Sequence, residues 1–223
     1  MRSVLVVAAG IVCIVFSSQA RAQLSTADID ALRAQGEREG WTFTVGENPA
    51  TRRPLSELCG VVQPPNWRDG ARFDACNPRS DLPPTYDWRH VNGQSYCTPI
   101  RDQRSCGSCW AFALLGAVES NIFIRDGMGQ DVSEQWLVSC CGLGGCSGEW
   151  PGNAANFLLG SGQYQDVYGG FGAVPEADFP YVAWDAPCDS GPYSHPWCLD
   201  TWAFVGPEWG IPTVAQLKQA ILD

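Results

Sequence analysis

The chain has 223 residues, a formal net charge of −10 and a sequence pI of about 4.6. Such an acidic protein has no electrostatic attraction for phosphate backbones or anionic membrane surfaces, so we expect no nucleic-acid partner. Hydrophobic residues make up 45% of the chain, with 10 Trp, and this composition predicts a compact globular protein rather than a disordered one.

Residues 1–22 are predicted to be a signal peptide. Arg2 precedes an apolar run from Val4 to Phe16, and Ala20-Arg21-Ala22 is a small-x-small cleavage site. The run is too short to span a bilayer comfortably, so no membrane anchor is expected after its removal. We therefore expect an exported protein, in an extracellular, periplasmic or lysosome-like compartment.

Export changes the interpretation of the cysteines. Of the 11 cysteines, Cys13 lies in the predicted signal peptide, which leaves ten. Exported thiols persist as disulfides, so bridges are favoured over metal ligation. A metal site at Cys140, Cys141 and Cys146 is the weaker alternative, because two of these residues are adjacent and no histidine is near. We expect neither a metal nor another cofactor.

The regular elements follow from capping and periodicity. Ser25 is predicted to cap a helix that stops at Gly40, and the turn-rich segment 41–81, with Cys59 and Cys76 as candidates for a bridge, is predicted not to fold alone. The main domain is predicted to start at residue 82. Its predicted elements are a buried helix Cys109–Arg125 closed by Asp126-Gly127, helices Ser133–Cys140 and Asn153–Leu159 (the latter stopped by Gly160), a strand Thr201–Val205, and a helix from Thr213 to Asp223.

The stretch from Gln103 to Cys109 carries the chemistry. Cys109 opens the buried helix, where free backbone N–H groups and the helix dipole favour a thiolate. Cys106 lies in a Gly-Ser loop that suits a disulfide. Gln103 is in the same loop, so its amide can return to the helix start and donate, with the N–H of Cys109, to a developing oxyanion.

Cys106-Gly107-Ser108-Cys109-Trp110 resembles the signature of the papain-like cysteine peptidases. The segment Leu82–Arg89 is similar to the family's mature start, and Ser133-Glu134-Gln135 to the opening of its second helix. The resemblance implies an α+β, papain-like two-lobe fold, of which the chain holds mainly the helical first lobe while the β-barrel-like lobe is largely missing. It also implies a peptidase that acts on peptides or proteins through a thioester on Cys109.

The resemblance further implies disulfides Cys106–Cys146 and Cys140–Cys188. Cys97, Cys141 and Cys198 stay unassigned. One wall of the substrate cleft resembles Gly148-Glu149-Trp150-Pro151, in which Glu149 stands where the family usually has glycine; a side chain there could crowd the cleft or add negative charge to it. Arg104 also replaces a usual glycine.

Trp41, Gly46, Asn48 and Leu58-Cys59-Gly60 resemble the short prosegment of cathepsin B. The resemblance implies that residues 23–81 lie across the cleft as an intramolecular inhibitor until they are removed, and that residues 82–223 form the catalytic domain. Only His195 falls in the region comparable to cathepsin B's histidine pair, so carboxydipeptidase activity is not expected.

The peptidase chemistry also needs an imidazole base. In this family it comes about 130 to 150 residues after the cysteine, but only 114 residues (223 − 109) follow Cys109, so the base and its orienting partner are expected beyond Asp223. His90 and His195 are interpreted as surface histidines.

Two other functions are alternatives to an active peptidase. A disulfide-rich binding module would make Cys109 a half-cystine, but it would need neither Gln103 nor a buried helix. An inactive papain-like homologue that binds peptides without cutting them remains the alternative to an active peptidase.

Overall fold

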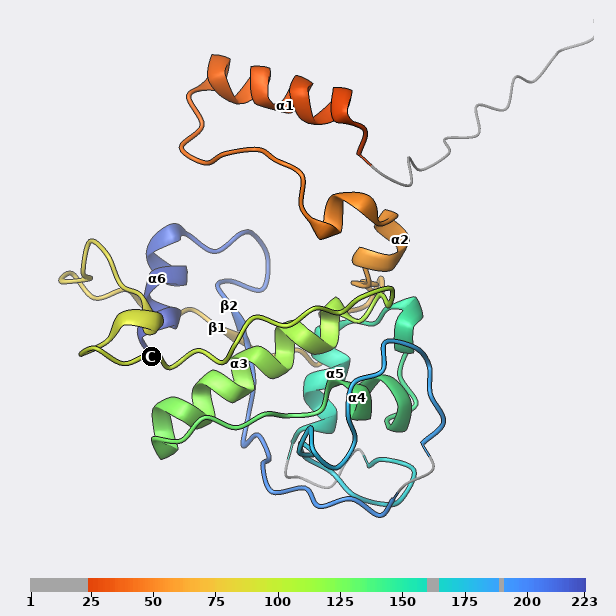
Figure 1. Cartoon of the computed structure of the whole chain (residues 1–223). Coiled ribbons are helices and arrows are strands. Elements are labelled where there is room, and N and C mark those ends of the chain that lie inside the picture. Colours follow the sequence, from red (N-terminus) through yellow and green to blue (C-terminus); the bar gives the residue numbers. More distant parts are fainter. Residues whose placement is uncertain (1–23, 160–164, 189–190) are drawn as a thin grey trace, which may run out of the picture. The chain divides into compact units, whose positions relative to one another are not determined.

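The computed structural model describes residues 24–159, 165–188 and 191–223 (Figure 1). The predicted signal peptide and the predicted helix stop at Gly160 lie outside the described residues. The chain divides into two compact units, one ending at Leu55 and the other running from Ser56 to Asp223. Residues 56–81 thus belong with the second unit.

The first unit contains the predicted N-terminal helix, α1 (Thr26–Glu39). Ser25 and Asp28 form a capping box, and Gly40 ends the helix at a φ of 68°, where a side chain would be strained. The prediction of this helix is confirmed. A 3₁₀ turn, η1 (Pro49–Arg52), follows.

The second unit is built on α3 (Cys109–Asp126), with α4 (Glu134–Cys140) and α5 (Pro151–Phe157) packed against it (Figure 1). Gly127 ends α3 at a φ of 73°, as expected from the sequence. The hydrophobic core contains Trp110, Leu115, Val132, Trp136, Leu137, Leu158 and Val174, all fully buried or nearly so.

The predicted burial of α3 is confirmed for one stripe of the helix only. This stripe lies in the core and includes Trp110, Leu115 and Ile122. Ile124, outside the stripe, is 38% exposed. An unbroken apolar sequence does not reveal which face meets a partner.

Two other boundaries differ from the prediction. The helix expected to begin at Asn153 begins at Pro151, because proline is favourable at the first helical position. The strand expected over residues 201–205 is the two-residue β2 (Phe204–Val205), which pairs in parallel with β1 (Phe73–Asp74). The remaining elements are α2 (Leu55–Leu58), η2 (Trp88–His90), η3 (Gly145–Ser147) and α6 (Val214–Leu222), the last with the predicted capping box at Thr213.

No helix in the described part of the chain is long and apolar enough to cross a membrane.

Candidate active site

Cys109 is the first residue of α3, so its sulfur lies at the positive end of the helix dipole. Its N-cap, Ser108, makes no capping bond through its side chain, and that side chain is fully buried. Cys109 itself is half-buried and reduced. A free thiol at a helix start that is also accessible has the features of a nucleophile rather than of a structural cysteine.

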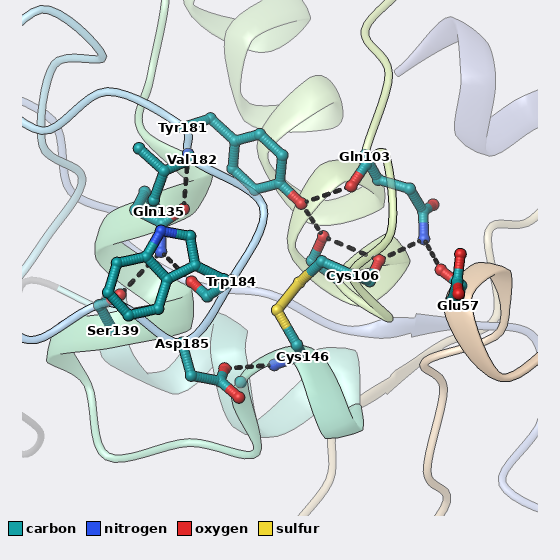
Figure 2. Close-up of a disulfide and its surroundings, with 12 residues drawn as sticks. Glu57, Gln103, Cys106, Gln135, Ser139, Cys146, Tyr181, Val182, Trp184 and Asp185 are labelled. Atoms are coloured by element: carbon teal, nitrogen blue, oxygen red, sulfur yellow. Dashed lines mark hydrogen bonds between the residues drawn. A yellow bond between two sulfur atoms is a disulfide. The ribbon is translucent and has the colours of Figure 1, made fainter.

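Gln103 points its amide into the loop that leads to Cys109 (Figure 2). Its Nε2 donates to the carbonyl oxygens of Cys106, at 2.8 Å, and Glu57, at 3.1 Å. The next residue, Arg104, adopts a φ of 53°, which explains why glycine is suited to this position. Its N–H donates to Asp102 Oδ1 at 2.8 Å, which supports the turn.

Residues 57–62 lie directly over the nucleophile. The N–H of Gly60 donates to Cys109 Sγ at 3.1 Å, and the carbonyl of Gly60 accepts from the N–H of Glu149 at 2.8 Å. Val62 N–H then donates to the carbonyl of Glu149 at 3.2 Å, so the two segments pair in parallel. The approach is close enough that a Cβ on Gly60 would lie 1.5 Å from the carbonyl oxygen of Gly107.

Two of the four predicted wall residues, Gly148 and Glu149, make this contact. A disulfide joins Cys106 to Cys146, just before the wall, with the pairing that the sequence resemblance implies (Figure 2). Asp185 accepts a hydrogen bond from the N–H of Cys146 at 2.7 Å. Gly148 has a φ of 102° and meets Gly60 so closely that it has no room for a side chain. The loop is therefore held in one shape, with its backbone facing residues 60–62.

The Glu149 side chain does not crowd the cleft, in contrast to the first expectation, because its carboxylate is bonded within its own loop. Its Oε1 accepts from the N–H of Trp150 at 2.7 Å and from Asn153 Nδ2 at 3.0 Å. Its Oε2 accepts from the N–H of Gly144 at 3.2 Å. The side chain thus turns back along its own loop, and only its backbone pairs across the cleft.

The other bridge is Cys140–Cys188, again the pairing that the resemblance implies. The Cys59–Cys76 bridge considered from the sequence is not formed, and both residues are free thiols.

Cys141 is buried, and desolvation, followed by repulsion from Asp166, raises the pKa of its thiol well above the ordinary value. Within the described ranges no three His, Cys, Asp or Glu side chains could hold a metal ion.

The interpretation of His195 as a surface histidine is wrong. Its side chain is only 11% exposed, and its Nε2 lies 3.3 Å from Oδ2 of the fully buried Asp166. Its other ring nitrogen, Nδ1, lies 3.0 Å from the Gly172 carbonyl, and Trp136 Nε1 donates to the same Asp166 oxygen at 3.1 Å. His195 therefore lies in the interior, between Asp166 and the Gly172 carbonyl. His90, by contrast, is exposed as expected.

A group of buried carboxyls, not expected from the sequence, lies beside the site. Glu119 and Glu134 line a cavity of about 290 Å³ whose wall also includes Gln103. Burial, with repulsion from Glu176 and Glu119, raises the pKa of Glu134 to about 8. Desolvation also raises the pKa values of Glu119 and Glu176. A single acidic residue inside the apolar run 109–124 was the available signal.

These carboxyls predict stability that falls with rising pH. The folded state binds more protons than the unfolded state between the ordinary glutamate pKa and about 8, so this contribution is complete below about pH 4.5 and is lost as the pH rises towards 8. For each extra proton that the folded state binds, the free energy of unfolding falls by up to about 1.4 kcal/mol per pH unit. Urea denaturation at pH 5.5 and pH 8 should show this decline, and Glu134→Gln should reduce it, whereas the exposed-site variant Glu208→Gln should retain it.

Comparison with known proteins agrees with this arrangement. Residues 82–201 match the papain family of cysteine proteases, and the chain belongs to that family. The helical part of the papain-like fold dominates the structure. Human cathepsin L2 is 39% identical over 157 residues, which cover 67% of this chain and 43% of the human protein. Digestive cysteine proteinase 1 of Homarus americanus is 33% identical, over 72% of this chain and 48% of that protein.

Solved precursors show the same fold. Digestive procathepsin L2 of Tenebrio molitor superimposes with a TM-score of 0.58 at 28% identity, covering 74% of this chain and 53% of the other. Recombinant stem bromelain precursor gives a TM-score of 0.59 at 25% identity, covering 79% and 54%. The chain spans about half the length of these relatives.

Proposed function

We propose that this chain is part of the inhibited precursor of a cysteine peptidase that cuts peptide bonds through Cys109. The thiolate of Cys109 attacks the carbonyl carbon of the scissile bond, and the carbonyl oxygen becomes an oxyanion that accepts from Gln103 and the N–H of Cys109. The amine leaves with a proton from an imidazole, and a thioester to Cys109 remains. Water then releases the acid and restores the thiol.

The imidazole is proposed to come from the part of the whole protein that this chain does not include. The ring nitrogens of His195 face Asp166 and Gly172, and His90 is exposed beside Asp87. Neither is a hydrogen-bond partner of Cys109 among the contacts of the described residues. An orienting Asn or Asp would fix the ring, as in other nucleophile and base pairs.

The observation that carries the proposal is the position of residues 57–62. They occupy the Gly148-Glu149 wall with backbone hydrogen bonds, as an extended peptide substrate would. The carbonyl of Glu57 accepts from Gln103 Nε2, the donor that we assign to the oxyanion. The oxyanion donor Gln103 and the Gly148-Glu149 wall therefore contact the same segment, residues 57–62.

The same segment explains inhibition without self-cleavage. Gly60 presents its N–H to Cys109 Sγ, and a nucleophilic sulfur needs a carbonyl carbon at that point. An N–H donor also stabilises negative charge on the sulfur and lowers its reactivity towards an electrophile. Residues 23–81 are accordingly proposed as a prosegment, and 82–223 as the start of the catalytic domain.

The signal-peptide layout of residues 1–22 supports export after their removal as a further part of the proposal. The family resemblance supports peptides or proteins as substrates and a cathepsin B-like character for Leu58-Cys59-Gly60. Because the Glu149 carboxylate is already bonded to three donors, we propose that it does not select charged substrate side chains.

An active-site label tests the function. A peptidyl chloromethyl ketone added to the whole protein should alkylate Cys109 after the prosegment is removed, and much more slowly before removal. The free thiols Cys97 and Cys198, mapped in the same digest by mass spectrometry, should stay unlabelled and act as internal controls. Labelling of those thiols instead of Cys109 contradicts the proposal, and peptide binding without alkylation or cleavage would indicate the inactive homologue.

A further inference from the structure

The hydroxyl of Tyr181 lies beneath the loop that carries the candidate site (Figure 2). Its oxygen is 2.6 Å from Ser108 Oγ and 2.8 Å from the backbone carbonyl oxygen of Gln103. Its ring makes an edge-on contact with Phe112, one turn into α3, with the ring centroids 4.9 Å apart. One side chain thus touches the residue before the nucleophile and the residue assigned to the oxyanion.

The direction of these hydrogen bonds follows from their chemistry. A carbonyl oxygen only accepts, so the single Tyr181 proton goes to Gln103. The short contact with Ser108 then requires the serine to donate. Burial raises the pKa of the Tyr181 phenol, so the phenol stays protonated and remains a donor at ordinary pH.

The segment that holds Tyr181 is itself anchored. The N–H of Tyr181 donates to Glu176 Oε1 at 2.8 Å, and the N–H of Val182 donates to Gln135 Oε1 at 2.9 Å. Gln135, fully buried in α4, also donates to the carbonyl of Trp184 at 2.9 Å (Figure 2). The hydroxyl is therefore fixed to the helical core.

We infer that Tyr181 is a positioning residue, whose hydroxyl sets the spacing between the oxyanion donor Gln103 and the nucleophile Cys109. This inference rests on the proposed function. While residues 57–62 are in place, Glu57 also holds the Gln103 amide. Once they leave, the remaining hydrogen bonds on Gln103 are those to Cys106 and Tyr181, so the tyrosine matters most in the mature enzyme.

Kinetics of Tyr181→Phe in the mature whole protein test the inference. The variant removes one oxygen, and we expect kcat to fall about tenfold while KM stays within about twofold, because the donor is displaced but peptide binding is not. Tyr168→Phe is the matched control, since its hydroxyl also donates to a backbone carbonyl, that of Cys188 at 2.7 Å. It should leave both constants unchanged.

A double-mutant cycle distinguishes positioning from general destabilisation. If Tyr181 acts through Gln103, Tyr181→Phe should change kcat by less than about twofold in a Gln103→Ala background. Losses that multiply in the double variant would overturn the inference, as would an unchanged kcat in the single variant.

A second measurement separates this inference from the proposed function. In the 223-residue chain, side-chain amide protons of Gln103 should exchange with solvent about tenfold faster in Tyr181→Phe, read by nuclear magnetic resonance. The indole N–H of Trp136, bonded to Asp166, should keep its exchange rate and so report an intact fold. An unchanged exchange rate of the Gln103 amide protons in Tyr181→Phe overturns the positioning role. If that exchange is faster in the variant but the wild-type whole protein does not cut peptides, only the proposed function is overturned.

Discussion

Replacing Cys109 with alanine is expected to lower kcat/KM for peptide hydrolysis by the mature whole protein by at least about 10⁴-fold. The variant has no sulfur to form a thioester, so only transition-state binding by Gln103 and the wall remains. Initial rates with a fluorogenic peptide, measured at enzyme concentrations high enough to detect the residual rate, give the ratio.

The control for this variant is Cys198→Ala. Cys198 is also a free thiol, and it is exposed and not among the residues assigned to the site. Its replacement should leave kcat/KM within about twofold, because surface substitutions away from a site have small effects. Appreciable peptide hydrolysis by Cys109→Ala would refute the assignment of the nucleophile.

The second large effect is expected from Gly60→Ala in the prosegment. A Cβ at this position would lie 1.5 Å from the carbonyl oxygen of Gly107, and backbone on both sides leaves no flexible side chain to move away. The segment has to lift from the site, which breaks the Gly60 contacts with Cys109 and Glu149. We expect the isolated prosegment to inhibit the mature enzyme at least about 100-fold more weakly, a loss of about 2.8 kcal/mol.

Gly46→Ala is the matched control, because it is the same substitution in the same prosegment. Only the far end of Arg33, at 3.9 Å, lies near a Cβ there. Its inhibition constant should equal that of the wild type. Equal inhibition by the Gly60 and Gly46 variants would show that residues 57–62 are not the inhibitory contact.

The local features of the chain could be predicted from the sequence because they depend on residues a few positions apart. Ser25 and Asp28, Thr213 and Gln216, and the glycine after α3 determine helix ends through bonds within one turn. The placement of Cys109 at the start of α3 is of this kind. Recognition of the family came from the same short stretch of sequence.

The contacts that position the site join residues far apart along the chain, and only the tertiary structure decided them. Gly60 meets Cys109 across 49 residues, Tyr181 meets Gln103 across 78, and Asp166 pairs with His195. No periodicity or capping rule encodes such pairs, since they arise when distant segments pack on one core. The sequence alone thus determined the nucleophile's helix and its immediate neighbours, while packing determined which side chains surround it.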